Sequence, residues 1–310
     1  MSNKTRRQFL RDTMLATGAL AMSPMAVHAQ DAAAKPVDMA IARWKSAPDA
    51  AMPEVAAKLT QQAIEALGGM KRFVKAGNVV WIKPNIGWDR TPEQAANTNP
   101  DLVKALVKMC FEAGAKKVKV GDNPCHDAAK SYANSGIEQA VKDAGGEVIF
   151  LDKNRFKEME IGGAVLKSIP VYPEIVESDL VISCPITKHH MSTTVTLCMK
   201  NYMGVIENRR KFHQDLPGCI RDMTAFMKPR LSLLDATRIL TDHGPTGGDL
   251  ADVKRMNIVA AGTDIVALDA FGAELLGHKP GDIGTVLAGH EAKLGTMNYK
   301  DLVLKELEVA

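Results

Sequence analysis

The sequence predicts an α/β fold of three layers, in which a mostly parallel sheet is flanked by helices. Short apolar runs of strand length alternate with longer segments of helical apolar spacing, a pattern typical of βαβ units. The run Val-Val-Trp-Ile at residues 79–82 has no polar alternation, as expected of a strand buried on both faces. Clusters of polar residues follow several predicted strands. Together these observations indicate a parallel sheet whose functional residues lie at one edge.

The first half of the chain alternates predicted strands with predicted helices. A helix over 53–67 ends at a Gly-Gly pair, and a helix over 100–113 has Asn99 as its predicted N-cap and Gly114 as its stop. The other elements expected in this half are strands over 37–42, 117–121 and 147–151 and a helix over about 135–144.

The second half continues the same pattern. Strands are expected over 180–184, 231–235 and 257–261, and an amphipathic helix over 264–276. The Gly162-Gly163 pair lies between two short apolar runs and predicts a local hairpin. A helix capped by a threonine is expected to begin near Val195 and to end near Gly204. Methionines at helical spacing in this half predict core packing rather than a copper site.

The N-terminus has the features of an export signal. A basic segment precedes a short apolar run and a Val-His-Ala sequence before residue 30, and Arg6-Arg7 followed by Phe-Leu resembles the twin-arginine (Tat) motif. We therefore predict a Tat signal peptide over 1–29 and a single α/β domain over 30–310. The mature protein is expected to be periplasmic or otherwise exported, with the Tat translocase as a partner during export and no stable membrane span after processing.

The charge balance argues against a nucleic-acid partner. The chain has 39 basic and 36 acidic residues, and four of the basic and one of the acidic residues lie in 1–29, so 35 of each remain. The five cysteines have no compact spacing, so no intrinsic iron–sulfur cluster is expected. One or two disulfides are compatible with export, and the odd count leaves at least one thiol.

Polar clusters follow four of the predicted strands directly. Lys83 and Asn85 come after 79–82, Asp122 begins the cluster after 117–121, residues 185–190 follow 180–184, and Asp235 closes 231–235. Open parallel sheets bind ligands beyond the carboxyl ends of their strands. The sequence therefore predicts one shared site at that edge.

Each predicted role follows from side-chain chemistry, and each has a structural alternative. The predicted acid–base or catalytic residues are Lys83, Asp122, His189 and Asp235. The predicted ligand-binding residues are Asn85, Lys188, Lys200, Asn201 and, in a glycine-rich loop, Gly247 and Gly248. The set that admits a divalent metal is Asp122, His189, His190 and Asp235. Alternatively, Lys83 is a surface lysine paired with a carboxylate, and Asp122 and Cys125 belong to a structural turn.

Several ordered motifs resemble the DUF362 family. They are IKPN, the block Thr-Lys-His…Thr…Lys-Asn-x-x-Gly, the loop GPTGG and the segment AGTDIVALDA, and the resemblance runs from about residue 37 to beyond 276. The family is a domain of unknown function that is sometimes fused to four-iron ferredoxin modules. This fusion links the family to iron–sulfur and redox chemistry. The ferredoxin cysteine motifs do not occur in this chain, and no catalytic role is carried over.

The first functional hypothesis is an exported enzyme or redox-associated protein that acts on a small anionic ligand. Because Asp122 and Asp235 would repel an anion, a metal or a protonated carboxyl is expected to accompany it. The alternative is a non-catalytic factor that binds a cofactor or metal, or that matures a partner redox protein. A third reading is a scaffold whose polar clusters only close loops.

Overall fold

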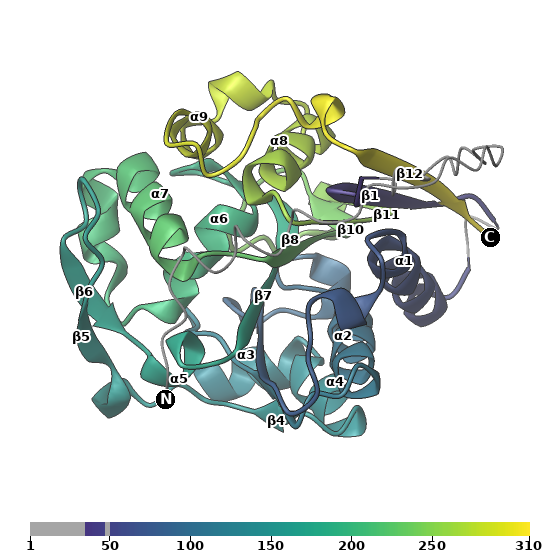
Figure 1. Ribbon diagram of the computed structural model, residues 1–310, viewed down its shortest axis with the longest axis horizontal. Helices are drawn as coiled ribbons and strands as arrows, with labels where there is room; N and C mark the ends of the chain where they lie inside the picture. Colours follow the sequence, from purple (N-terminus) through teal and green to yellow (C-terminus); the bar gives the residue numbers. More distant parts are fainter. Residues whose placement is uncertain (1–34, 47–49) are drawn as a thin grey trace, which may run out of the picture. The chain divides into compact units, whose positions relative to one another are not determined.

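The computed structural model describes residues 35–46 and 50–310, and within them a ten-stranded sheet forms the middle layer (Figure 1). The predicted signal peptide over 1–29 lies outside the described residues. The strands of this sheet are β1 Met39–Trp44, β2 Val79–Pro84, β3 Lys117–Val120, β4 Glu147–Val148, β7 Leu180–Cys184, β8 Ile186–His190, β9 Thr194–Thr196, β10 Leu231–Leu240, β11 Val253–Gly262 and β12 Leu304–Val309.

The sheet is mostly parallel, as predicted. The main path runs β12-β1-β11-β10-β7-β2-β3-β4, and β4, β3, β2, β7 and β10 form a continuous parallel set. Strand β11 is antiparallel to both of its neighbours, β10 and β1. Strand β8 follows β7 after Pro185 and pairs with the later residues of β10, so β7 and β8 together flank one side of β10.

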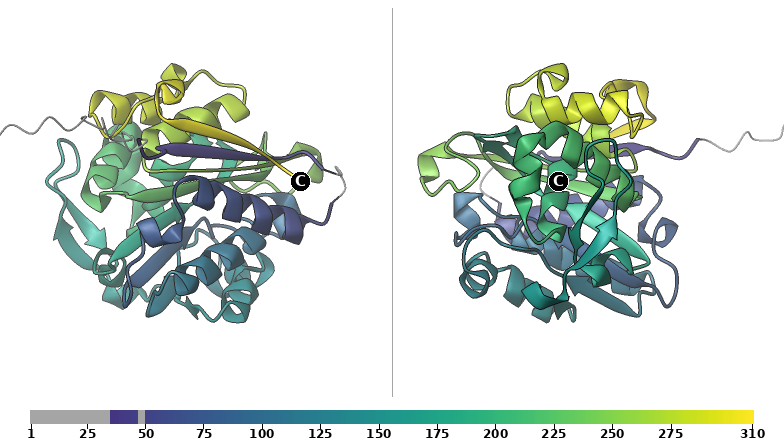
Figure 2. Two further views of the ribbon diagram at one scale, coloured as in Figure 1. Left: turned by 45° about the vertical axis from the view of Figure 1, so that its right-hand side comes forward. Right: turned by 90° about the vertical axis from the view of Figure 1, so that its left-hand side faces the viewer.

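Helices cover both faces of the sheet (Figure 2). Alternate strand residues enter two separate cores: Val80 and Ile82 of β2 pack with α1 and α2, whereas Trp81 lies in the core that contains α6, α7 and α8. The helices are α1 Met52–Ala66, α2 Pro100–Glu112, α3 Ala128–Asn134, α4 Ile137–Asp143, α5 Pro173–Val176, α6 Cys198–Asn201, α7 Leu216–Met227, α8 Ile265–Leu275 and α9 Gly284–Glu291. The predicted α/β class with helices flanking a mostly parallel sheet is therefore confirmed.

Local signals placed several element boundaries correctly. The Asn99 side chain accepts a hydrogen bond from the backbone of Asp101 and caps α2, as predicted. The Gly162-Gly163 hairpin exists as a separate two-stranded sheet of β5 Lys157–Glu160 and β6 Ser168–Val171.

Among the described residues, no helix combines the length and apolar character needed to cross a bilayer.

Three expectations were wrong. Residues 194–196 form strand β9, which pairs with β8, and α6 begins only at Cys198 without a threonine cap. Helix α8 is buried almost all round, rather than amphipathic, because it packs between the sheet and α6 and α9. Strand β10 continues to Leu240, so Asp235 lies inside a strand and not at its end.

Candidate functional site

A pocket of about 360 Å³ opens beyond the carboxyl ends of β2 and β3. Its walls come from β8, from α6 and the turn after it, and from the loop around Pro245, so it lies at the sheet edge that the sequence predicts. The volume is in the range of small-molecule sites. The polar and charged lining residues include Lys83, Asn85, Asp122, Asn123, Lys188, His190, Thr196, Lys200, Asn201 and Arg209.

An ion pair forms one wall of the pocket. Lys83 Nζ lies 2.7 Å from Asp122 Oδ1, and both side chains are almost fully buried. The same ammonium donates to Asn201 Oδ1 at 2.8 Å and to Pro84 O at 2.9 Å. Burial lowers the pKa of Lys83, and the Asp122 carboxylate opposes that shift. With three acceptors around its three N–H groups, Lys83 has no donor left for an anionic ligand.

Neighbouring backbone groups enclose this ion pair on its other sides. Asp122 also accepts hydrogen bonds from the backbone N–H groups of Ile86 at 2.7 Å and Asn123 at 2.8 Å. A methyl group at Gly204 would overlap the Asp122 carboxylate and lie 2.5 Å from Lys83 Nζ, so only glycine allows the backbone this close. The pair is thus electrically neutral and sterically enclosed.

Lys188 supplies a buried ammonium that has no carboxylate partner among the residues that the structure describes. Its Nζ donates to Ala96 O at 2.6 Å and to Pro245 O at 2.9 Å, and it lies 5.8 Å from the centre of the Trp88 ring. Burial lowers the pKa of Lys188 well below its usual value, and the charge of Lys200 lowers it further. An anion in the pocket would compensate this charge.

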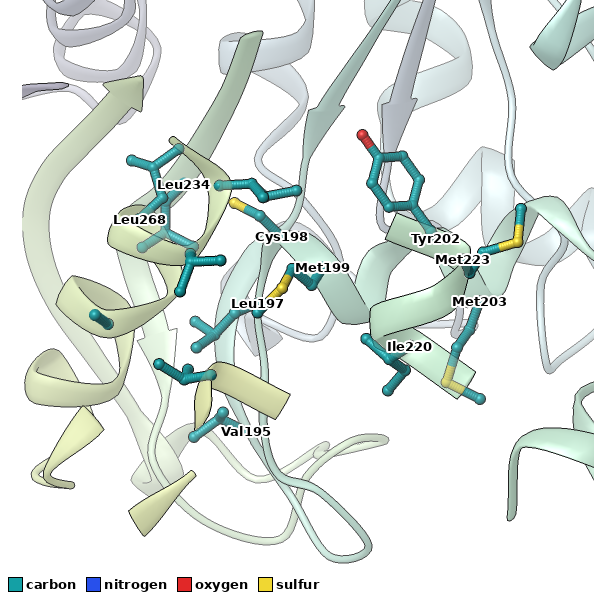
Figure 3. Close-up of a cluster of buried hydrophobic side chains, with 14 of the residues drawn as sticks. Val195, Leu197, Cys198, Met199, Tyr202, Met203, Ile220, Met223, Leu234 and Leu268 are labelled. Carbon is teal, nitrogen blue, oxygen red and sulfur yellow. The ribbon is translucent and has the colours of Figure 1, made fainter. Parts of the chain in front are cut away.

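Lys200 projects from α6, whose start is held by tertiary contacts. The backbone N–H groups of Cys198 and Met199 donate to the Asp269 carboxylate at 2.6 and 3.0 Å. Cys198, Met199 and Tyr202 are buried in the apolar core (Figure 3), as the methionine spacing predicts. Lys200 is half-buried, and no described residue forms a hydrogen bond or ion pair with its ammonium group. Burial lowers the pKa of Lys200 to about 8.

Arg209 adds a positive charge to those of Lys188 and Lys200. Its guanidinium donates to Met203 O at 3.1 Å, to Asn123 O, and to the sulfur of Cys125 at 3.4 Å. These contacts hold the guanidinium at the pocket wall. Cys125 is the exposed one of five free cysteines, and it also lines the pocket.

The two adjacent histidines have different positions. His190 lines the pocket, and its Nδ1 accepts a hydrogen bond from Ser192 N at 3.1 Å, which leaves the ring proton on Nε2. Burial, followed by the charges of Lys200 and Lys188, lowers the pKa of His190 to about 2, so the ring is a neutral donor. His189 Nδ1 accepts from Gly244 N at 3.1 Å, and this residue is not part of the lining.

Asp235 is separate from the pocket, contrary to the shared-site prediction. Its carboxylate is fully buried and accepts from Asn99 N at 2.7 Å, from Thr237 N at 2.9 Å and from Thr237 Oγ1 at 2.7 Å. These bonds fix the start of α2 against β10. Within residues 35–46 and 50–310, no three His, Cys, Asp or Glu side chains form a group suited to a metal ion. The predicted metal set of Asp122, His189, His190 and Asp235 is therefore not assembled.

The glycine-rich loop contributes different residues from those expected. The carbonyl of Gly247 accepts from Arg90 at 3.3 Å and that of Gly248 from Gln94 at 2.9 Å, so these glycines anchor the loop. Pro245 and Thr246 of the same loop line the pocket instead.

Two polar atoms at the pocket have no partner among the described residues. They are Asn85 Oδ1 and Thr196 Oγ1, and both are buried atoms of lining residues. Thr196 lies opposite Lys188 in the β8–β9 pairing. Unpartnered buried polar atoms are uncommon in native proteins, and a ligand in the pocket would satisfy them.

Sequence reasoning missed Arg209, Trp88 and Thr196 as lining residues. Arg209 belongs to a short 3-10 segment, Arg209–Gln214, with no strand end nearby in sequence. The sequence predicts a helix start near Thr196, whereas the pairing of β9 with β8 brings this residue to the pocket wall. For Trp88, the sequence signal that indicates a lining position is its place three residues after Asn85.

A second hollow, of about 540 Å³, lies near the amino end of β7 and has a different character. Its two carboxylates are already engaged: Asp179 accepts from Val79 N at 2.7 Å, and Asp222 accepts from the backbone of Val165 at 2.7 Å and Leu166 at 2.9 Å. These side chains stabilise loops, so the carboxyl-edge pocket is the better candidate site.

Comparison with known proteins defines the class to which this fold and pocket belong. Residues 80–274 match the family described as domain of unknown function DUF362. That segment covers more than half of the chain and includes every residue that lines the pocket, so the chain belongs to the DUF362 family.

Similarity to individual proteins extends over most of the chain. The thylakoid-associated protein sll1697 of Synechocystis sp. is 28% identical over 245 residues, which cover 73% of this chain and 71% of that protein. The lactate racemase apoprotein from Thermoanaerobacterium thermosaccharolyticum is 16% identical, with a TM-score of 0.45. That match covers 78% of this chain and 57% of the racemase chain.

Proposed function

We propose that the carboxyl-edge pocket binds a small anion with a carboxylate or phosphate group, and that the protein is an exported enzyme or redox-associated protein acting on it. One observation carries the proposal: within the described part of the chain, Lys188, Lys200 and Arg209 have no carboxylate partner in the pocket. Asp122 supplies the only carboxylate among the described lining residues, and it is paired with Lys83. The pocket therefore has an excess of positive charge that an anion would balance.

The neutral donors of the pocket support the same ligand class. His190 presents an Nε2–H, and Thr196 has an unused hydroxyl, so an anion would receive hydrogen bonds as well as charge. The pocket does not require a metal or a protonated carboxyl to accompany the anion. That requirement depends on two aspartates that repel the anion, whereas Asp122 is neutralised by Lys83 and Asp235 lies outside the pocket.

Export is proposed on two grounds. The N-terminal sequence has the twin-arginine pattern followed by an apolar run and small residues. The similar protein of Synechocystis sp. carries the name thylakoid-associated. We therefore propose that the mature protein is periplasmic or otherwise exported.

Calorimetric titration with inorganic phosphate and with lactate tests the proposal. Lys200→Ala should weaken anion binding about 10- to 100-fold, the effect of one charge-assisted hydrogen bond. The matched control is Lys254→Ala, because Lys254 is an exposed lysine of β11 outside the pocket lining. Equal affinities of wild type and Lys200→Ala, with both proteins folded by circular dichroism, would contradict the proposal.

The pH dependence gives an independent check. Because a bound anion favours the protonated lysines, binding should be accompanied by proton uptake. The pKa of Lys200 is about 8, so affinity should fall as the pH rises through that value. An affinity that stays constant between pH 6 and pH 9 would exclude Lys200 as a ligand.

A further inference from the structure

Lys200 differs from the other two lysines of the pocket in the freedom of its amine. Lys83 Nζ is enclosed by three acceptors, and Lys188 Nζ is held by two backbone carbonyls. The Lys200 amine has neither kind of anchor within the described part of the chain. Its backbone, in contrast, is fixed because Asp269 caps the start of α6. A rigid backbone thus presents an amine that is free to react.

Burial favours the neutral form of the Lys200 amine. Burial is the main cause that lowers the pKa of Lys200 to about 8, and Arg209 and Lys83 lower it further, whereas Cys125 and Asp122 oppose the shift. Lys188 and His190 also lie in the pocket, and His190 is uncharged. At pH 7 roughly one tenth of such an amine carries the lone pair that a nucleophile needs.

We propose that Lys200 is a catalytic nucleophile that forms an imine with the carbonyl carbon of a small anionic aldehyde or ketone, a 2-oxo acid being the simplest member. The inference rests on the proposed anion binding, because Arg209 and Lys188 would hold the anionic group while the carbonyl faces Lys200. The unpartnered Thr196 hydroxyl would donate a hydrogen bond to an oxygen of the same ligand, and Asn85 Oδ1, which only accepts, would receive one from the hydroxyl group that the ligand gains when Lys200 adds to its carbonyl carbon.

The step balances without an oxidant, a reductant or a metal. The neutral Lys200 nitrogen attacks the carbonyl carbon, a C–N bond forms, and one N–H proton passes to the former carbonyl oxygen. The C–O bond then breaks, and the oxygen leaves as water with the second N–H proton. A proton from solvent gives the cationic imine, which withdraws electrons from the neighbouring carbon.

Reductive trapping tests this step. The exported, folded protein is incubated with pyruvate and sodium cyanoborohydride and then mapped by peptide mass spectrometry. The expected result is one dominant adduct on Lys200, with about tenfold lower yield when inorganic phosphate competes for the pocket. Lys200→Arg should abolish that adduct, whereas the exposed-site control Lys254→Arg should leave it unchanged.

Further arms identify the anionic group. Dihydroxyacetone phosphate carries a phosphate in place of the carboxylate, and acetone carries neither. A higher yield with pyruvate or with dihydroxyacetone phosphate names the preferred anion, and either supports the imine. Acetone should label Lys200 about tenfold less, since it lacks the charge-assisted contacts. Equal labelling by acetone would overturn the role of the anionic group.

Failure of this inference is distinguishable from failure of the proposed function. If phosphate binds to the wild-type pocket but labelling is spread over surface lysines or is unchanged in Lys200→Arg, the imine is refuted and anion binding stands. If neither phosphate nor pyruvate binds, both are refuted. Comparable melting temperatures of the Lys200→Arg variant and the wild type would show that lost labelling is not caused by unfolding.

Discussion

Replacing Asp122 by asparagine should destabilise the protein strongly. The substitution keeps the side-chain shape but removes the charge that lies 2.7 Å from Lys83 Nζ, where both groups are almost fully buried. With an effective dielectric constant of about 20, the attraction at that distance is roughly 6 kcal/mol before desolvation. Removing one partner of a buried ion pair typically costs about 3–5 kcal/mol, because the other charge stays buried and unpaired.

The local hydrogen bonds support the upper part of that range. Each Asp122 oxygen accepts a backbone N–H, from Ile86 and Asn123, and an asparagine can offer an acceptor oxygen on only one side. We therefore expect the free energy of unfolding at pH 7 to fall by about 4 kcal/mol. Urea denaturation followed by circular dichroism measures it.

The pH dependence checks the cause of the loss. Burial already lowers the pKa of Lys83, so the unfolded state binds more protons than the folded state between the folded and unfolded pKa values. In that window the free energy of unfolding rises with pH. Without Asp122 the pKa of Lys83 falls further, so the window of the variant is wider. The difference in unfolding free energy between wild type and variant should therefore shrink towards pH 10. The double variant Lys83→Met/Asp122→Asn should recover part of the loss. A loss below about 1 kcal/mol, or a deficit independent of pH, would refute this reasoning.

Three further predictions follow from particular contacts. Gly204→Ala should lower the unfolding free energy by about 1–3 kcal/mol, because its methyl group overlaps the Asp122 carboxylate; a melting temperature equal to that of wild type would contradict this. Burial raises the pKa of Asp269 to about 7, so the stability that this residue contributes is lost as the pH rises through 7. Asp269→Asn should therefore lose less stability at pH 8 than at pH 5, as measured by urea titration. Lysine at both Arg6 and Arg7 should leave the precursor unprocessed in the cytoplasm, and normal processing seen on an immunoblot would exclude the twin-arginine pathway.

Local sequence predicted the elements whose signals are contained within a few residues. The apolar run at 79–82 became part of β2, and Asn99 caps α2 as its side chain requires. The run of β-branched residues around Val195 indicated a poor helix start, but its strand conformation depends on pairing with β8. Asp235 looked like a strand end because it is charged, yet β8 and β11 extend β10 past it, and backbone donors satisfy its carboxylate.

The sequence by itself determined the sheet architecture and the edge at which polar residues gather, because apolar periodicity and the direction of parallel strands fix both. Only the tertiary structure decided which residues can act there. Lys83, Lys188 and Lys200 are equivalent lysines in the sequence, but their acceptors come from distant segments: Asp122 and Asn201 surround the first, and Ala96 and Pro245 hold the second. Among residues 35–46 and 50–310, Lys200 has no such partner, because the freedom of an amine depends on which atoms the fold brings within about 3 Å of it.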